Sequence, residues 1–173
     1  MISKENLFSR DYTHVENWKM NNHNNKEEDY EIITYPDAVF VFALTDNNQV
    51  LLLDQYSVAA QERINHLVAG YVEDSEKPID AAKRELEEET GYVANSFQKI
   101  GVSDRSTWAT GDYIFFLAKG ATNTGEKELD SSEDINVEEI EIQKIKELLK
   151  DSDLHAVGSV ACAYKALNYL GEL

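Results

Sequence analysis

Several residue types are scarce in this chain of 173 residues, and each scarcity excludes a class of protein. A single cysteine, Cys162, cannot form an internal disulfide, and its apolar neighbours favour a buried, inert thiol over a nucleophile. Lys and Arg number 16 against 33 Asp and Glu, and the net charge of -17 excludes a protein that binds the DNA or RNA backbone. The apolar run Val39–Leu44 is too short to span a bilayer, and Met1–Asp11 carries charges where a signal peptide is apolar. We therefore expect a cytoplasmic protein with neither a nucleic acid polymer nor a membrane as its partner.

What the chain does contain is a dense set of carboxylates on one predicted helix. Pro78 fits only the first turn of a helix, and Gly91 fits a left-handed C-terminal cap, so the pattern predicts a helix from about Pro78 to Thr90. At about 100° per residue, Glu85, Glu88 and Glu89 fall within one arc of this helix, beside an apolar arc. Like charges at this separation oppose one another, so a cation is expected among them.

Two interpretations of the cluster are open on the carboxylates alone. Oxygen ligands suit hard divalent cations, and magnesium binds through a few carboxylates while it keeps waters and substrate phosphates as its other ligands. The alternative is a solvated acidic helix face, which is what a run of charges usually is. Arg84 can pair with Glu88 one turn along, but one guanidinium leaves most of the negative charge uncompensated.

Residues at fixed spacing around the helix favour the metal site. Gly70 is followed after five residues by Glu76, and after seven more by Arg84-Glu85-Leu86-Glu87-Glu88-Glu89-Thr90-Gly91-Tyr92. This pattern resembles the Nudix box, the signature of hydrolases that cleave nucleoside diphosphates linked to another moiety. Tyr92 alone departs, because the family usually has an aliphatic residue there. Outside these 23 residues the chain is similar to the ADP-ribose and nucleoside-diphosphate-sugar pyrophosphatase branch, over Asp29–Gly70, Phe115–Gly120 and Ser132–Ile135.

The resemblance implies a set of metal ligands and a cofactor. Glu85 and Glu89 would be direct ligands, and Glu88 would be a further ligand or a water-mediated contact. The carbonyl oxygen of Ala69 would be another donor. The expected cofactor is Mg²⁺, for which Mn²⁺ would substitute, and its role is to withdraw charge from the phosphates and lower the pKa of a water.

The resemblance also implies the catalytic set Glu133, Glu88 and Arg84. Members of this branch carry the general base on a loop after the box, which makes Glu133 the first choice. An ordinary solvated loop acid is the alternative. Arg84 would orient the carboxylates through charge-assisted hydrogen bonds, and Glu76 would help to hold the element in shape.

Substrate-binding residues are expected at positions where the chain departs from the branch. Basic residues commonly flank the Gln-Tyr pair in this branch, but none does here, so Arg63 or Arg105 would contact phosphate instead. His66 stands where many relatives have an acid, and it would contact phosphate or sugar or be a hydrogen-bonded structural residue. Trp108 would stack on a base or pack in the core, and Trp18 and Tyr12 of the N-terminal arm allow the same interpretation. The segment Ser103–Asp112, expected as a loop, lacks the proline typical of ADP-ribose-specific members, which weakens that assignment.

Strands on both sides of one central helix, with a further helix at the end, predict an α/β protein with a mixed sheet between helices. The resemblance implies the Nudix-type α/β/α sandwich, with residues 1–35 as an N-terminal β arm and residues 36–173 as the Nudix hydrolase domain. Extended pieces are predicted over Asp11–Lys19 and Tyr30–Tyr35. N-terminal strands in this branch often cross to a partner subunit, so a homodimer is expected; the alternative is a hairpin covering its own subunit.

The function that follows is metal-dependent hydrolysis of the pyrophosphate linkage in a nucleoside diphosphate linked to a sugar or another moiety. It would release a nucleoside monophosphate and a phosphorylated second product. A housecleaning pyrophosphatase acting on nucleoside triphosphates is the alternative enzyme. A nucleotide-sensing module without catalysis is a different class, but such modules usually have eroded box acids, and Glu85, Glu88 and Glu89 are all present.

Overall fold

The computed structural model describes residues 1–125, 127–129 and 134–173. Within them lie three helices, α1 (Pro78–Thr90), α2 (Ile142–Asp151) and α3 (Val157–Leu170). The strands are β1 (Ser3–Arg10), β2 (Thr13–Asn21), β3 (Glu27–Thr34), β4 (Ala38–Thr45), β5 (Gln49–Ser57), β6 (Glu62–His66), β7 (Val68–Tyr71), β8 (Tyr92–Ser106), β9 (Ala109–Asn123) and β10 (Ile135–Glu141).

The strands form one mixed sheet in the order β1-β2-β3-β9-β4-β5-β10, to which β6, β7 and β8 are added through β5, β4 and β9. Strand β4 lies at the centre, parallel to β9 and antiparallel to β7. The predicted α/β class with a mixed sheet is therefore confirmed. None of the helices among the described residues has the length and apolar character to cross a membrane.

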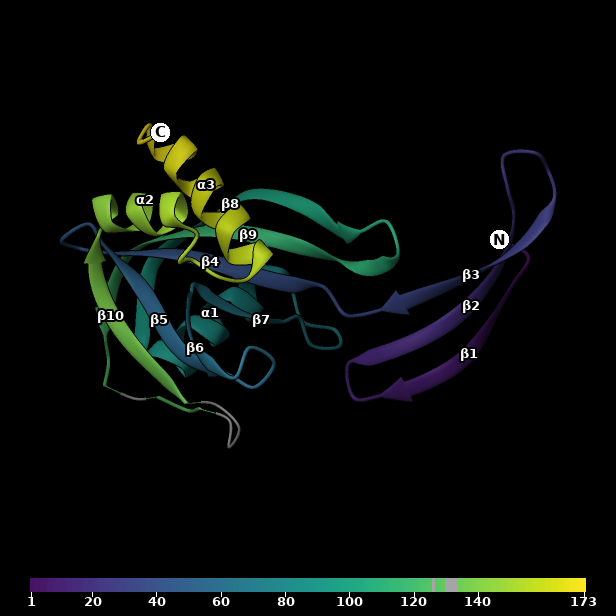
Figure 1. The fold of residues 1–173 in the computed structure, drawn as a ribbon. Helices are drawn as coiled ribbons and strands as arrows, with labels where there is room; N and C mark the ends of the chain where they lie inside the picture. Colours follow the sequence, from purple (N-terminus) through teal and green to yellow (C-terminus); the bar gives the residue numbers. More distant parts are fainter. Residues whose placement is uncertain (126, 130–133) are drawn as a thin grey trace.

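Alternation along β4 explains why helices cover both faces of the sheet (Figure 1). All eight residues of β4 are buried, which is typical of a strand packed on both faces. Phe40 and Phe42 belong to a core cluster shared with α2 and α3. Val39 and Val41 belong to a second cluster that contains Ala82 and other residues of α1. Side chains of successive residues point to opposite faces, so one strand anchors both layers.

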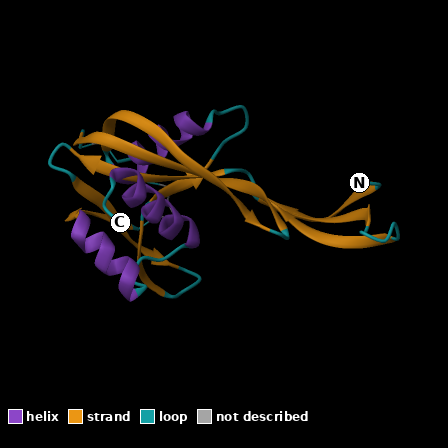
Figure 2. Ribbon diagram, turned by 90° about the horizontal axis from the view of Figure 1, so that it is seen from above, coloured by secondary structure: helices purple, strands orange, loops and turns teal. Residues whose placement is uncertain are grey.

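Strands β1, β2 and β3 form an antiparallel arm that extends away from the body (Figure 2). The arm joins the sheet where Ile33 of β3 lies parallel to Ala109 of β9 and its N–H donates to the carbonyl oxygen of Trp108 at 3.1 Å. The expected start of the first extended piece at Asp11 is wrong. Asp11 has φ 43° and lies with Tyr12 in the turn between β1 and β2, because a residue in the left-handed region ends a strand.

The loop expected over Ser103–Asp112 is also wrong. Strands β8 and β9 form a long hairpin whose pairing continues to Ser106 and Ala109, which leaves only Thr107 and Trp108 at the turn. The sequence did not predict a strand here, because polar residues such as Asp104 interrupt the alternation of apolar and polar residues that indicates one. Their backbone is nevertheless paired, since β9 supplies antiparallel partners along nearly the whole length.

Candidate active site

Helix α1 begins and ends where the sequence predicts. Pro78 occupies its first turn, where the missing N–H costs no hydrogen bond. Gly91 has φ 72°, and its N–H donates to the carbonyl oxygen of Glu87 at 2.7 Å. Leu86 is fully buried against the sheet, so the neighbouring arc with Glu85, Glu88 and Glu89 faces the strand that precedes the helix, β7.

Arg84 is the centre of the ion pairs at this site. Its Nε and Nη2 donate to the two carboxylate oxygens of Glu76, each at 3.0 Å, and Nη2 also donates to the carbonyl oxygen of Tyr71 at 3.0 Å. Its Nη1 donates to Glu85 at 2.7 Å and to Glu88 at 3.0 Å. The hydrogen bonds from Arg84 lower the pKa of Glu76, and those carboxylates raise the pKa of Arg84 itself. The guanidinium therefore stays charged and ties the loop before α1 to the acidic face.

Strand β7 supplies the opposite wall of the site. The N–H of Ala69 donates to Glu89, a buried glutamate, at 3.1 Å. Gly70 packs so closely on Glu85 that a Cβ atom would overlap its carboxylate. Ala69 and Gly70 pair with Phe40 and Val39 of the central strand β4, which fixes their backbone. Glycine at position 70 of the box therefore has a steric reason, because any larger residue would collide with Glu85.

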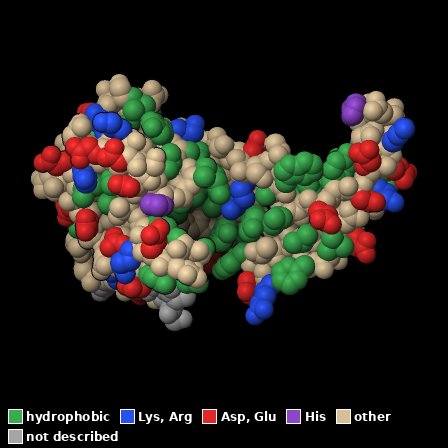
Figure 3. Space-filling view, viewed as in Figure 1, with side chains coloured by type: hydrophobic (Ala, Val, Ile, Leu, Met, Phe, Trp, Pro, Cys, Tyr) green, Lys and Arg blue, Asp and Glu red, His purple; other side chains and the backbone are tan. Residues whose placement is uncertain are grey.

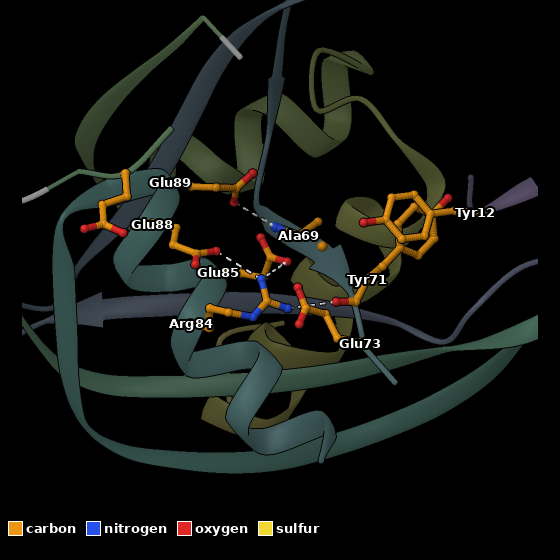
Figure 4. A pocket seen from close by; sticks show the side chains of 10 residues that line it. Tyr12, Ala69, Tyr71, Glu73, Arg84, Glu85, Glu88 and Glu89 are labelled. Carbon is orange, nitrogen blue, oxygen red and sulfur yellow. Dashed lines mark hydrogen bonds and ion pairs between the residues drawn. The ribbon is translucent and has the colours of Figure 1, made fainter. Parts of the chain in front are cut away.

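Between α1 and β7 lies a cavity of about 490 Å³ that we call the acidic cavity (Figure 4). Three of its lining residues, Tyr71, Glu73 and Glu128, were not predicted. Tyr12, from the turn of the arm, stacks on Tyr71 with ring centroids 5.0 Å apart. Glu73 and Glu128 add carboxylates to the wall, and the N–H of Glu128 donates to the carbonyl oxygen of Glu88 at 3.2 Å. The full lining is Tyr12, Ala69, Gly70, Tyr71, Glu73, Arg84, Glu85, Glu88, Glu89 and Glu128.

The donors around the acidic cavity fit a hard divalent cation in their chemistry. Glu85, Glu88 and Glu89 bring carboxylate oxygens to the same wall as the backbone of Ala69, and oxygen ligands are what Mg²⁺ prefers. In the part of the chain that the structure describes, no three acidic, histidine or cysteine side chains are arranged as a ready metal site. Nη1 of Arg84 contacts two of the carboxylates, and the third accepts the Ala69 N–H.

Arg63, one of the predicted substrate-binding residues, lies between β5, β6 and the start of β10. Arg63 donates to the Asp54 side chain at 2.8 Å and to the Asp134 side chain at 2.9 Å, so its guanidinium joins β6 to the start of β10. It does not line the acidic cavity. Glu133, the first choice for the general base, lies outside the described residues.

His66 is a buried residue at the end of β6. Its Nδ1 lies 2.9 Å from the carbonyl oxygen of Leu67, which it contacts as a donor, while Nε2 has no hydrogen-bond partner among the described atoms. Burial lowers the pKa of His66, which favours the neutral ring. His66 is not among the residues that line the acidic cavity, so its substrate-binding role stays a prediction.

The remaining predicted residues lie toward the arm. Trp108 is 59% exposed at the turn of the β8–β9 hairpin, with its ring 6.4 Å from that of Tyr30. Trp18 lies under the ammonium of Lys4 at 3.9 Å and donates to Glu16 at 2.6 Å. The guanidinium carbon of Arg105 lies 4.5 Å from the Tyr35 ring centroid. The structure does not bring these three residues to the wall of the acidic cavity, and their roles stay predictions.

Comparison with known proteins agrees with this geometry. The family model of the NUDIX domain matches residues 34–159. An ADP-ribose pyrophosphatase of Bacillus subtilis (strain 168) is 31% identical over 156 residues, covering 89% of this chain and 84% of the relative. A methanol dehydrogenase activator of Bacillus methanolicus is 30% identical over 128 residues, covering 72% of this chain and 69% of the relative. A crystal structure of an ADP compounds hydrolase has a TM-score of 0.83 at 20% identity, covering 99% of this chain and 95% of that one.

Proposed function

This chain belongs to the NUDIX domain family and is a Nudix hydrolase, and on that basis we propose how it acts on its substrate. It hydrolyses the pyrophosphate linkage of a nucleoside diphosphate joined to a sugar or a similar group. The observation that carries the proposal is the acidic cavity, where the box glutamates of α1 face the backbone of Ala69 and Gly70. The similarity to an ADP-ribose pyrophosphatase supports this substrate class.

The proposed ion is Mg²⁺, with Mn²⁺ as a substitute. When bound, such an ion withdraws charge from the phosphates and makes hydroxide available from water near neutral pH. Glu85, Glu88 and Glu89 would hold it together with the carbonyl oxygen of Ala69. Without a cation, the carboxylates of the cavity would repel the phosphates of the substrate, because like charges oppose one another.

The reaction forms one bond and breaks one. The oxygen of water bonds to one phosphorus, the P–O bond to the bridging oxygen breaks, and that oxygen leaves on the other phosphate. A carboxylate accepts the proton that water loses. Glu133 was the first choice for this base, and Glu128 is a second candidate because it lines the acidic cavity and its backbone contacts the end of α1.

The two candidates for the base can be separated by single substitutions. Removal of a general base costs about 10²–10⁴-fold in turnover number, whereas an ordinary loop acid has little effect. Glu128→Gln and Glu133→Gln should therefore differ by at least tenfold in turnover number. Equal activity in both variants and the wild type would contradict a base on this loop.

The proposed function is tested with a substrate panel. ADP-ribose, several nucleotide sugars and nucleoside triphosphates are incubated with and without Mg²⁺, and a coupled phosphatase reports the monophosphate products. A diphosphate-linked substrate should be cleaved in a metal-dependent way. Preference for triphosphates would favour the housecleaning alternative, and binding without cleavage would favour a sensing module. The panel also decides whether ADP-ribose is the substrate despite the proline-free segment Ser103–Asp112.

A matched pair of variants tests the site itself. Glu89→Gln keeps the shape of a buried side chain that accepts the Ala69 N–H but removes its charge. It should lower turnover by at least about 100-fold, whereas in a sensing module it should leave nucleotide affinity largely intact. Glu87→Gln removes the same charge from an exposed position on the same helix and should leave turnover within about twofold. Full activity in Glu89→Gln would refute the assigned site.

We also propose that residues 1–35 form a dimer arm and residues 36–173 the catalytic domain. Every residue of β1 is exposed, and the strand is an edge of the sheet. Figure 3 shows hydrophobic side chains along the arm and in the hollow where it meets the body; Leu7 and Phe8 are each about half exposed. An exposed edge strand is a template for pairing with another chain. Leu7→Asp with Phe8→Asp should convert a dimer to a monomer in light scattering, and a monomeric wild type would end the proposal. The cytoplasmic location remains a prediction.

A further inference from the structure

We propose that Arg84 is a built-in cation that competes with the divalent ion for Glu85 and Glu88, and so sets how tightly that ion binds. The inference rests on the proposed function, because it concerns the same carboxylates. It differs from a purely orienting role, in which loss of Arg84 would weaken metal binding.

The contacts of the guanidinium divide into a fixed side and an exchangeable side, and Figure 4 shows those with Tyr71, Glu85 and Glu88. On the fixed side, Nε and Nη2 bind both oxygens of Glu76, and Nη2 also binds the carbonyl oxygen of Tyr71. These partners belong to the segment before α1 and do not depend on the acidic face. On the exchangeable side, Nη1 alone reaches Glu85 and Glu88.

Nη1 of Arg84 contacts one oxygen of the Glu85 carboxylate at 2.7 Å and one oxygen of the Glu88 carboxylate at 3.0 Å. A divalent ion held by Glu85 and Glu88 must therefore displace Nη1 from these carboxylates or share their negative charge with it. The fixed side keeps the guanidinium in place during this exchange, because a bidentate pair with a carboxylate is strong and directional. Arg84 thus remains beside the ion as a positive charge and lowers its affinity.

Arg84 also compensates the negative charge of the site when no ion is bound. Three carboxylates on adjacent turns repel one another when no ion is bound. Arg84 compensates part of that charge in the free enzyme. Glu76 holds it there through a side chain that is itself only 17% exposed. In the free enzyme Arg84 therefore reduces the repulsion among these carboxylates, and in the ion-bound enzyme it lowers the affinity for the ion.

The test measures ion binding without turnover. Binding of Mn²⁺ is followed by the loss of the free-ion EPR signal, and binding of Mg²⁺ by calorimetry. Arg84→Gln should bind Mn²⁺ about tenfold more tightly than the wild type, since each of two partly exposed ion pairs is worth at most a few-fold in an equilibrium constant. Arg84→Lys should increase the Mn²⁺ affinity less, because lysine keeps the positive charge but lacks the guanidinium group that binds two oxygens at once.

Lys83→Gln is the matched control. It removes one positive charge from the neighbouring position of the same helix, where the ammonium lies 3.8 Å from Asp80 and is largely exposed. Its ion affinity should stay within about twofold of the wild type. If Arg84→Gln binds Mn²⁺ no more tightly than Lys83→Gln, or binds it more weakly, the competition is refuted and an orienting role remains.

A measurement on the unmodified chain covers the case in which Arg84→Gln does not fold. Nitrogen-15 NMR of the arginine side chains should show that Mg²⁺ changes the Nη1 environment of Arg84 while its Nε signal stays in place. An unchanged Nη1 signal at saturating Mg²⁺ would overturn the inference. Failure of the wild type to bind either ion would instead refute the proposed function, so the two failures are distinguishable.

Discussion

Substitution of Gly70 by alanine tests whether the two walls of the acidic cavity must approach as closely as they do. The added Cβ atom would overlap the carboxylate group of Glu85, which is the far end of a flexible side chain. The backbone of β7 is held by its pairing with β4, so the carboxylate is the part that must move. We therefore expect the substitution to damage the site and largely spare the fold.

The two costs can be worked out separately. Moving the Glu85 carboxylate breaks its 2.7 Å contact with Arg84, a pair worth less than about 1 kcal/mol because both side chains are partly exposed. For a chain of this size that loss lowers the melting temperature by at most about 2–4 °C. Displacing a metal ligand should cost at least as much as losing one of its supporting contacts, which is about 10–100-fold in metal affinity or activity.

The assay compares Gly70→Ala with Gly101→Ala. At Gly101 the atoms nearest to an added Cβ atom belong to the flexible Lys165 side chain, at 3.0 Å, and Gly101 does not line the acidic cavity. Calorimetry gives Mg²⁺ affinity and melting temperature, and the coupled phosphatase gives turnover. Wild-type activity in Gly70→Ala would refute the assigned role of Glu85. A fall of more than about 10 °C in melting temperature would show that the fold, rather than the site, requires the glycine.

Three further predictions concern stability. Ser159→Ala removes the acceptor of the buried Leu67 N–H, a 3.1 Å bond between α3 and the strand region, and should cost about 1–3 kcal/mol in thermal unfolding, whereas an unchanged melting temperature would contradict this. Burial raises the pKa of the Cys162 thiol from 9.0 to about 12. The contribution of the neutral thiol to the free energy of unfolding is therefore complete below pH 9, and up to about 4 kcal/mol of it is lost as the pH rises toward 12. Cys162→Ala should not show this alkaline loss of stability in urea titrations. Arg84 lowers the pKa of Glu76. The Glu76 carboxylate therefore stabilises the fold fully above its ordinary pKa of 4.5, and this stabilisation decreases as the pH falls below that value. The difference in unfolding free energy between the wild type and Glu76→Gln should shrink on acidification.

Helix α1 was predictable from sequence because local rules fix it. A proline that suits only the first turn and a glycine that suits a left-handed cap mark its two ends, and the structure has the helix between them. The spacing of Glu85, Glu88 and Glu89 places them on one face by helical geometry alone. The family follows from the same residues, and the match to the NUDIX domain confirms it.

Strand lengths and cavity walls were not predictable, because they depend on partners far away in the chain. The pairing of β8 and β9 extends past Asp104 through backbone bonds that leave no side-chain pattern. Tyr12 reaches the cavity only because β1 and β2 fold back on each other and present their turn to Tyr71. Glu128 belongs to a polar stretch from which the resemblance favours Glu133, and only the contact of its N–H with the Glu88 carbonyl oxygen at the end of α1 places Glu128 at the cavity.

The narrow junction between arm and body has a mechanical consequence. In the part of the chain that is described, β3 and β9 are registered at one residue pair, Ile33 with Ala109, and the β1–β2 turn that carries Tyr12 lies at this same end of the arm, because His14 pairs with Thr34. The turn between β2 and β3, residues 22–26, forms the far end of the arm, so a small rotation at the joint moves that end further than it moves Tyr12. A partner bound at the far end of the arm would therefore act as a lever on this joint and on the Tyr12–Tyr71 contact at the wall of the acidic cavity.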